Sequence, residues 1–273
     1  MIEAVVCDLD GTLLDQAARI RPLGARALKA LAAAGFRIVL ASGRSWRTVL
    51  RIQRQLGLTG PFIAHNGAYG FDSETETEWH RRTVPRTRAQ EFVAWADAAQ
   101  VMVRCYLGVG QPVLYNRFDL AHQLCWLKPE DRLVSNLAAT LPSDPVEIFL
   151  SGQDAVDDLI RRFGLLGPDY ELTIFKRVGY REVNICAPGV DKVEALEALS
   201  RQAGLKPDQI LAIGDGLNDV RMLKWAGLSV AVGDGHPAAR EAAQYITPPN
   251  VDPVLDGLRW ALPDYLGLLS NTA

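Results

Sequence analysis

Residues 5–14 read Val-Val-Cys-Asp-Leu-Asp-Gly-Thr-Leu-Leu, and the rest of the chain is organised around this stretch. Its β-branched start predicts a buried strand. Asp8 and Asp10 stand two positions apart, so they project to the same side of an extended chain, where two like charges repel unless a cation or a shared proton relieves them. Gly11 then breaks the strand. The stretch predicts a carboxylate nucleophile beside a second, acid/base carboxylate, with Mg²⁺ between protein and phosphate; a plain acidic turn is the alternative.

Composition narrows the class of protein. The chain has 273 residues, enough for a large core and two domains. It carries 29 Lys and Arg against 32 Asp and Glu, which gives a net charge of −3. The chain therefore lacks the excess of positive charge that is typical of nucleic-acid-binding proteins. No apolar run reaches the length of a membrane span, and no secretory leader opens the chain. We therefore expect a cytoplasmic protein without nucleic-acid or membrane partners; the oligomeric state is not predicted.

The cysteines predict neither a zinc site nor a disulfide framework. Cys7, Cys105, Cys125 and Cys186 lie far apart, and no C-x-x-C pair occurs. Cys7 adjoins Asp8 and could be a nucleophile. The preferred interpretation is a small buried side chain on the opposite face of the strand.

Alternating elements at both ends of the chain predict a parallel sheet. Apolar strands alternate with helices rich in Ala and Leu, the rhythm of right-handed βαβ units. Pro22 suits a first helical turn, and Gly35 and Gly57 suit helix ends. The first predicted strand starts at about residue 3 and is broken by Gly11. The other predicted strands cover residues 36–40, 61–64, 209–213, 228–232 and 245–247, and the helices cover residues 22–34, 45–56, 192–203, 220–226, 238–243 and 251–262.

Between these two segments the pattern is that of an inserted α+β domain with an antiparallel sheet. Residues 72–78 are acidic and suit a hairpin tip or a linker. Helices are predicted at residues 86–100 and 154–163, and strands at residues 101–107, 112–116, 146–150, 172–178 and 181–186, the last two joined by a turn at Gly179-Tyr180. The predicted architecture is a Rossmann-like core of residues 1–82 and 188–273 with an inserted domain of residues 83–187.

Nearly every apolar strand of the core ends in a polar or glycine-rich cluster. These clusters are Asp8/Asp10, Ser42/Arg44, Asn66/Gly67, Asp215/Asn218/Asp219 and Gly233/Asp234/Gly235. The carboxyl ends of parallel strands share one edge of the sheet, where ligands bind. We therefore expect one active site built from both ends of the chain.

The residue types suggest phosphoryl transfer. Asp8 would attack phosphorus and form an aspartyl phosphate, and Asp10 would protonate the leaving oxygen and then activate water. Asp8, Asp215 and the backbone carbonyl of Asp10 would hold Mg²⁺. Asp219 would support the metal indirectly, through a water molecule or by contacting one of the ligands.

Phosphoryl oxygens also need fixed donors. Ser42 and Lys192 would contact them, with backbone N–H groups near Gly11 and Gly43. Arg44, Asn66 and Asn218 complete the predicted substrate-binding set. In isolation Ser42-Gly43-Arg44 could cap a helix, Lys192 could be a solvated lysine, and Asn66-Gly67 could be a simple turn. His65 is expected to be structural or on the surface.

These motifs resemble the haloacid dehalogenase superfamily, Cof-type subfamily, with a type IIB cap. The motifs that carry the resemblance are Asp8-Leu9-Asp10-Gly11-Thr12, Ser42-Gly43-Arg44, Asn66-Gly67-Ala68, Lys192 and Gly214-Asp215-Gly216-x-Asn218-Asp219. The resemblance implies a Rossmann-like core, a mobile cap, Mg²⁺ and hydrolysis of small phosphorylated metabolites, often sugar phosphates. Asp10 fits phosphatases and phosphomutases rather than dehalogenases. Asp234 stands where relatives have Asn, and because Asp cannot donate the hydrogen bonds of an amide, a pair between Lys192 and Asp234 is expected instead.

Substrate choice is assigned to the inserted domain. Arg177, Tyr180, Arg181 and Glu182, near its last hairpin, are candidates; a charged hairpin facing solvent is the alternative. Two other functions stay open, a phosphomutase and a non-enzymatic sensor of phosphorylated metabolites on the same fold. A receiver-like phosphoacceptor would leave the insertion and Asp10 unexplained.

Overall fold

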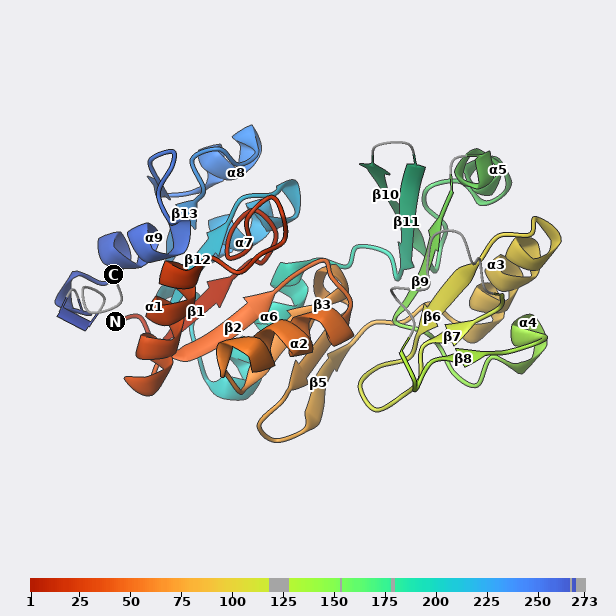
Figure 1. The fold of residues 1–273 in the computed structure, drawn as a ribbon, viewed down its shortest axis with the longest axis horizontal. Coiled ribbons are helices and arrows are strands. Elements are labelled where there is room, and N and C mark those ends of the chain that lie inside the picture. The colour runs from red at the N-terminus through yellow and green to blue at the C-terminus, as the bar shows by residue number, and fades with distance from the viewer. Residues whose placement is uncertain (118–127, 153, 178–179, 266, 269–273) are drawn as a thin grey trace. The chain divides into compact units, whose positions relative to one another are not determined.

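The chain folds into two compact units in the computed structural model. One comprises residues 1–80 and 191–273, and the other comprises residues 81–190. The structure describes residues 1–117, 128–152, 154–177, 180–265 and 267–268. The first unit is an α/β layer structure, and the second is α+β (Figure 1). The predicted fold class is therefore confirmed.

The first unit is built on a sheet with the strand order β14-β13-β12-β1-β2-β3-β4-β5. The bounds are β1 Ala4–Cys7, β2 Arg37–Ala41, β3 Pro61–Ala64, β4 Tyr69–Asp72, β5 Thr77–Arg81, β12 Ile210–Gly214, β13 Leu228–Ala231 and β14 Tyr245–Ile246. From β14 to β3 every pair is parallel, and β3 pairs antiparallel with β4. All four residues of β1 are buried, as expected for a central strand covered on both faces. The carboxyl ends of six strands consequently meet at one edge.

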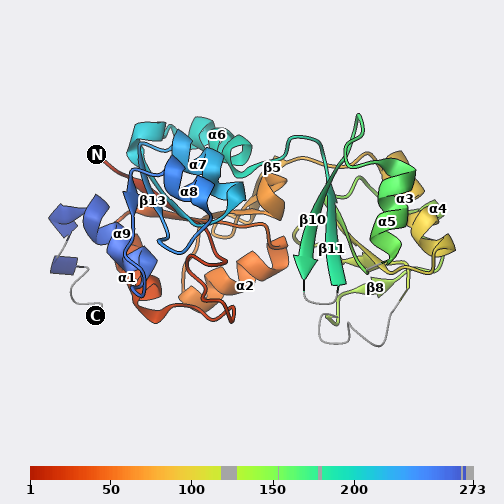
Figure 2. The same cartoon turned by 90° about the horizontal axis from the view of Figure 1, so that it is seen from above.

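Helices cover both faces of this sheet (Figure 2). The bounds are α1 Pro22–Ala33, α2 Trp46–Leu56, α6 Lys192–Ala203, α7 Val220–Trp225, α8 Pro237–Ala242 and α9 Pro253–Ala261, with short 3₁₀ turns η1 His65–Gly67, η2 Pro207–Gln209, η3 Leu217–Asp219 and η4 Pro263–Tyr265. Helices α6, α7 and α8 share an apolar cluster with alternate residues of the strands, such as Val6 and Ala212. Helices α1, α2 and α9 lie on the opposite side. Gly57 and Gly204 end α2 and α6 in the left-handed conformation that glycine adopts most readily.

The second unit is a sheet with helices on one face. Its strand order is β10-β11-β9-β6-β7-β8. The bounds are β6 Val103–Tyr106, β7 Leu114–Tyr115, β8 Arg132–Leu133, β9 Glu147–Ser151, β10 Glu171–Arg177, β11 Tyr180–Cys186, α3 Arg86–Ala98, α4 Leu137–Thr140 and α5 Asp154–Phe163. Residues of α3, α4 and α5 form one apolar core with alternate strand residues. The predicted antiparallel pairing is confirmed from β10 to β7, but β7 and β8 pair parallel.

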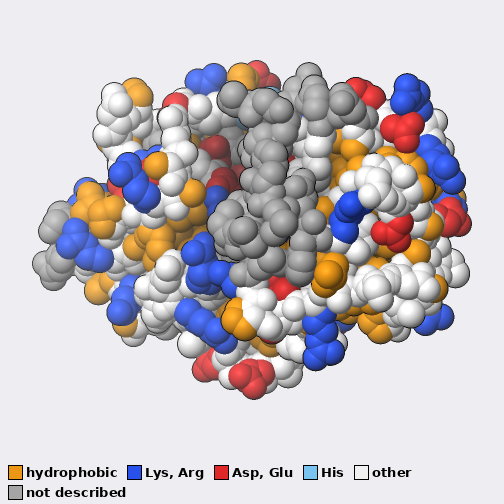
Figure 3. Space-filling model, turned by 45° about the vertical axis from the view of Figure 1, so that its right-hand side comes forward, with side chains coloured by type: hydrophobic (Ala, Val, Ile, Leu, Met, Phe, Trp, Pro, Cys, Tyr) orange, Lys and Arg blue, Asp and Glu red, His pale blue; other side chains and the backbone are white. Residues whose placement is uncertain are grey.

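Four smaller outcomes concern the acidic stretch, the surface charges, the thiols and membrane-spanning helices. Residues 73–76 connect β4 to β5, so the acidic stretch is a hairpin tip and not a linker. Acidic and basic side chains are interspersed on the face shown in Figure 3, in keeping with the balanced charge. Cys7, Cys105 and Cys186 are free thiols, and burial raises the pKa of Cys7, which disfavours a nucleophilic role; Cys125 lies outside the described residues. Within the described ranges, no helix has both the length and the apolar character needed to cross a membrane.

Candidate active site

Asp8 lies immediately after β1, at the carboxyl edge of the sheet. Its backbone N–H donates to the carbonyl of Ile213 in β12 at 2.9 Å, which continues the parallel ladder. Its side chain is buried, and its Oδ1 lies 2.5 Å from Nζ of Lys192. The carboxylate is therefore held in one place by a strand end on one side and a charge on the other.

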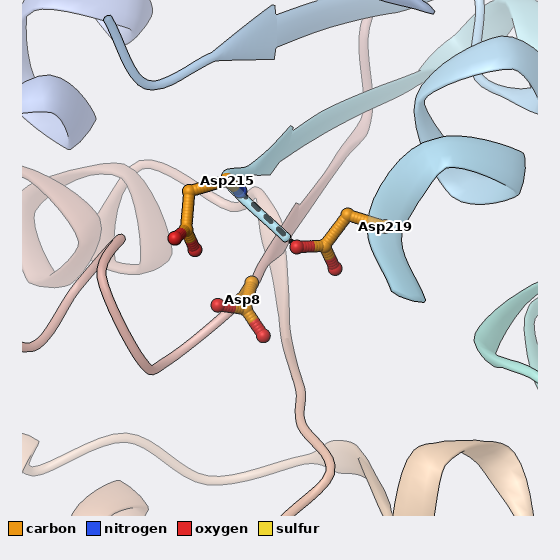
Figure 4. Close-up of side chains that lie close together, drawn as sticks. All are labelled: Asp8, Asp215 and Asp219. Atoms are coloured by element: carbon orange, nitrogen blue, oxygen red, sulfur yellow. Dashed lines mark hydrogen bonds between the residues drawn. The ribbon is translucent and has the colours of Figure 1, made fainter. Parts of the chain in front are cut away.

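Asp219 lies beside Asp8, in the turn after β12. Its Oδ1 is 2.6 Å from Nζ of Lys192, and its Oδ2 accepts the N–H groups of Asp215 at 3.1 Å and Gly216 at 2.8 Å. Figure 4 shows Asp8, Asp215 and Asp219 side by side, with the hydrogen bond from the backbone of Asp215. Both oxygens of Asp219 are thus engaged, so this residue shapes the turn that carries Asp215.

Lys192 is the first residue of α6. The preceding Asp191 is the N-cap, whose side chain accepts the N–H of Glu194 at 3.0 Å and so fixes where the helix begins. Within the described residues, the ion-pair partners of Lys192 are Asp8 and Asp219, whereas Asp234 is exposed. The expected pair between Lys192 and Asp234 is therefore wrong, because the helix start directs the lysine to the strand-end carboxylates.

Acidic side chains outnumber basic ones around Asp8, at the carboxyl edge of the sheet. Oxygens of Asp8, Asp215 and Asp219 all lie within 4.8 Å of one another, and one lysine faces them. Burial, followed by the charge of Asp219, raises the pKa of Asp8 well above its usual range. Burial alone would lower the pKa of Lys192, but the charges of Asp219 and Asp8 outweigh it and raise that pKa. The site therefore favours an additional cation.

Of the carboxylates of Asp8, Asp215 and Asp219, that of Asp215 is the most exposed to solvent. Its Oδ1 accepts the hydroxyl of Thr12 at 2.9 Å, and its carbonyl accepts the N–H of His236 at 2.7 Å. Burial raises its pKa to about 6. Gly11 has φ +80°, and a Cβ there would overlap the Asp215 carboxylate. The glycine of the first motif is thus explained by the close approach of the two strand-end turns.

Ser42 and Arg44 form the loop after β2. The N–H of Ser42 donates to the carbonyl of Ile63, and its Oγ accepts the N–H of Arg44 at 3.1 Å. Helix α2 begins later, with Ser45 as its N-cap, so Ser42 is not the cap of a helix. The Arg44 guanidinium binds both oxygens of Asp10, at 2.7 and 2.5 Å, and this hydrogen bonding raises the pKa of Arg44. Sequence reasoning missed this ion pair.

The turn at residues 65–67 contacts the loop after β2, the turn after β12 and the start of α6. His65, Asn66 and Gly67 all have positive φ, of 52°, 55° and 110°. Asn66 Oδ1 accepts the side-chain N–H of Asn218 at 3.0 Å, and its backbone N–H donates to Ser42. Gly67 lies against the carbonyl of Asp191, where a Cβ would overlap. The glycine is therefore required both by its φ and by contact with the start of α6.

Replacing Gly67 with alanine should cost more stability than replacing Gly60. Both glycines have strongly positive φ, 110° and 100°, but no atom of the described residues lies within 4 Å of a Cβ at Gly60. Gly60→Ala should cost about 1–2 kcal/mol of unfolding free energy from backbone strain. Gly67→Ala should cost about 2 kcal/mol more, because it also pushes residue 67 away from Asp191. Urea unfolding of the two variants measures the difference; equal costs would contradict the close contact.

The specificity candidates belong to the second unit. Arg181 pairs with Asp157 of α5 at 2.7 Å, and backbone pairing joins Arg177 to Tyr180 at the end of the hairpin. Gly179 of the predicted turn lies outside the described residues. The role of this hairpin in substrate choice stays a prediction.

The fold and the site together define an α/β protein with a carboxylate site at the carboxyl ends of parallel strands. The sequence pattern of the haloacid dehalogenase-like hydrolases matches residues 5–258. The chain belongs to the haloacid dehalogenase-like hydrolase family. The predicted family and enzyme class are therefore confirmed.

Several known proteins are similar to this chain over most of its length. The chain is 24% identical to the 5-amino-6-(5-phospho-D-ribitylamino)uracil phosphatase YitU of Bacillus subtilis, with 97% of each chain covered. It is 25% identical to the chloroplastic endoribonuclease YBEY of Arabidopsis thaliana over 89% of this chain, but it spans only 43% of that relative. A solved HAD subclass IIB sugar phosphatase superposes with a TM-score of 0.71 at 21% identity, covering 97% of this chain and 99% of that one, which shows a shared fold.

Proposed function

We propose that this protein is a Mg²⁺-dependent phosphatase that hydrolyses small phosphorylated metabolites through an aspartyl phosphate. The observation that carries the proposal is the buried Asp8 carboxylate at a strand end, with Lys192 on one oxygen and Asp215 and Asp219 beside it. Asp10 follows two residues later and is about half exposed, where it can reach a ligand. A nucleophile, a fixed cation and an acid/base group are the minimum set for this reaction.

The donor set fits a magnesium ion. Among the described residues, three carboxylates face one lysine, so the site carries an excess of two negative charges when all three are ionised, and carboxylate oxygens are the ligands that Mg²⁺ prefers. Both oxygens of Asp219 are engaged, so Asp8, Asp215 and the backbone carbonyl of Asp10 are the proposed ligands, with Asp219 in support. Bound there, Mg²⁺ would supply the positive charge that offsets the carboxylates and the phosphoryl oxygens.

Mg²⁺ affinity should depend on pH through Asp215. Because its pKa is raised to about 6, a proton occupies this carboxylate at lower pH and competes with the cation. The apparent dissociation constant should rise as the pH falls through about 6, by at least roughly tenfold per pH unit well below it, because the proton on Asp215 competes with the cation and a proton on Asp8 adds to this competition. Calorimetric titration between pH 5 and 8 measures it. Asp215→Asn should weaken binding, and Asp208→Asn, at an exposed carboxylate, serves as the control. An affinity that stays constant down to pH 5 would count against Asp215 as a ligand.

In the first proposed step, an oxygen of Asp8 attacks phosphorus while the bond to the leaving oxygen breaks. Asp10 donates a proton to that oxygen, and the leaving alcohol departs. In the second step Asp10 removes a proton from water, the water oxygen attacks phosphorus, and the bond between phosphorus and the Asp8 oxygen breaks, which releases inorganic phosphate and restores the Asp8 carboxylate. Arg44 holds both oxygens of Asp10. The phosphate dianion would compete for this guanidinium, and Asp10 could then exchange protons with the substrate.

Fixed donors hold the phosphoryl group in this proposal. Ser42 and Lys192 would contact its oxygens, with backbone N–H groups near Gly11 and Gly43. Asn66 and Asn218, already joined at 3.0 Å, would contact the substrate at the rim.

Substrate identity is proposed only as a class. Several relatives are named for phosphatases, and a solved neighbour is a sugar phosphatase, so sugar phosphates or similar small metabolites are the proposed substrates. We assign catalysis to a core of residues 1–82 and 188–273 and specificity to a cap of residues 83–187. Their limits differ by two or three residues from those of the compact units. A cytoplasmic location stays a prediction.

The test is phosphate release from a panel of sugar phosphates, nucleotides, cofactor phosphates and an aryl phosphate. The expected result is stoichiometric release of inorganic phosphate that requires Mg²⁺ and stops with chelator. Transfer of phosphate between positions of a substrate, without release, would indicate a phosphomutase. Tight binding without turnover across the panel would indicate a sensor.

A further inference from the structure

Helix α2 begins without a side-chain cap of its own. Within the part of the chain that the structure describes, the N-cap Ser45 makes no capping hydrogen bond, and its hydroxyl instead lies 3.3 Å from that of Thr48. The first N–H groups of a helix have no partner within the helix and need one from elsewhere. The N–H of Trp46, the first residue of α2, finds that partner in the imidazole of His65, whose Nε2 accepts it at 3.1 Å.

His65 is a fixed group. Its side chain is fully buried, and its backbone lies in the left-handed region at φ 52°, an uncommon conformation for a residue other than glycine. Because Nε2 accepts a hydrogen bond, that nitrogen carries no proton, and the neutral ring carries its proton on Nδ1. Strained backbone of this kind persists only where its surroundings hold it in place.

The same residue is bonded to the loop that carries Ser42 and Arg44. The backbone N–H of His65 donates to the carbonyl of Arg44 at 2.9 Å, and the next N–H, of Asn66, donates to the carbonyl of Ser42 at 3.1 Å. With the imidazole on Trp46, three hydrogen bonds from one turn hold both ends of residues 42–46. The two backbone hydrogen bonds do not depend on the residue types at positions 65 and 66. The hydrogen bond from Trp46 to the imidazole is the one that requires the His65 side chain.

We propose that His65 is a positioning residue, whose neutral imidazole holds the Ser42–Arg44 loop in place for phosphoryl binding by fastening it to the first turn of α2. This inference rests on the proposed phosphatase function. His65 does not touch the phosphoryl group in this assignment; it acts through Ser42 and Arg44.

The test compares His65→Leu, which removes the acceptor, with His65→Gln, which keeps an acceptor at a similar distance along the side chain. With p-nitrophenyl phosphate, His65→Leu should lower kcat about 10- to 100-fold, because small displacements of positioned groups cost this much, while KM changes less than about threefold. His65→Gln should restore kcat to within about threefold of the wild type. Asp252→Ala is the control, because Asp252 caps α9 with hydrogen bonds to Val254 and Leu255 outside the proposed site. It should lower the unfolding midpoint and leave kcat within about threefold.

Two measurements that do not depend on turnover complete the test. Amide exchange at Trp46, followed by ¹⁵N NMR, should be at least about tenfold faster in His65→Leu and near the wild-type rate in His65→Gln. In the wild type, ¹⁵N shifts should identify Nε2 as the unprotonated ring nitrogen at neutral pH, whether or not a variant folds. A protonated Nε2, or a His65→Leu protein that keeps kcat while Trp46 exchanges fast, would overturn the inference. So would equal losses in the Leu and Gln variants. If the wild type releases no phosphate from any substrate, the proposed function fails, and the exchange and ¹⁵N measurements still decide whether the imidazole fastens the loop.

Discussion

Replacing Asp8 with asparagine is expected to abolish phosphate release, with a loss on the order of 10⁴-fold or more. Asparagine has nearly the same shape, but its neutral amide is a poor nucleophile and cannot form the aspartyl phosphate. Phosphate release from the best substrate of the panel, with Mg²⁺ present, measures the effect.

The Asp8→Asn protein should still fold. Asp8, Asp215 and Asp219 together carry more negative charge than Lys192 offsets, so the neutral amide relieves repulsion while Asp219 still pairs with the lysine at 2.6 Å. Thermal unfolding followed by circular dichroism checks this point. Asp208→Asn, at an exposed carboxylate, should keep full activity. Turnover that survives Asp8→Asn in a folded protein would mean that another group is the nucleophile.

The position of the site could be predicted from the sequence because the topology of a parallel sheet determines it. A carboxylate that directly follows a buried strand lies at the carboxyl edge wherever that strand sits in the order. Asp8, Ser42, Asn66 and Asp215 each follow such a strand, and neighbouring strand ends come within hydrogen-bonding distance whatever their separation in sequence. The contact between Thr12 and Asp215 spans 203 positions.

Pairings between side chains at that edge could not be predicted in the same way. Arg44 reaches Asp10 through a long side chain whose direction is chosen by local charges, and a strand pattern contains no information on this choice. Lys192 was expected beside Asp234 from a comparison of residue types, whereas the start of α6 decides its direction. His65 was expected to be structural or on the surface, and the hydrogen bond from Trp46 to its imidazole was missed for a similar reason. A missing helix cap becomes visible only when the first N–H groups of α2 are followed to their acceptors.

The inserted unit was predicted less completely because its elements are short. Strand β7 lies within the strand predicted at residues 112–116. Strand β8 has two residues and helix α4 has four, too few for a repeating apolar pattern to be recognised, and neither was predicted. In the first unit, strand β5 was missed because Trp79 is its one apolar residue and the others are polar, as in many strands at the edge of a sheet. Helix α3 and strand β9 are long enough to show a repeating pattern of apolar positions, and both were predicted from the sequence.

Replacing Lys192 with methionine is expected to lower the unfolding free energy by about 3–5 kcal/mol when chelator is present. Methionine fills a similar volume, but it leaves the buried carboxylates of Asp8 and Asp219 facing each other without a positive charge. Removing one partner of a buried ion pair costs this much because the remaining charge is neither solvated nor paired. Urea unfolding in chelator measures the loss, and Lys206→Met, at an exposed lysine, should change stability by less than about 0.5 kcal/mol.

Mg²⁺ should restore part of this stability, and the recovery separates two explanations of the loss. If the cost comes from unbalanced charge, a cation bound by the native state stabilises it by about 2.7 kcal/mol at a hundred times its dissociation constant. If the cost came only from poor packing of the methionine, Mg²⁺ would stabilise the variant no more than the wild type. Because removing Lys192 leaves the carboxylates with a larger excess of negative charge, the variant should bind Mg²⁺ more tightly than the wild type does. A variant with normal stability in chelator and unchanged Mg²⁺ affinity would show that Lys192 does not balance this site.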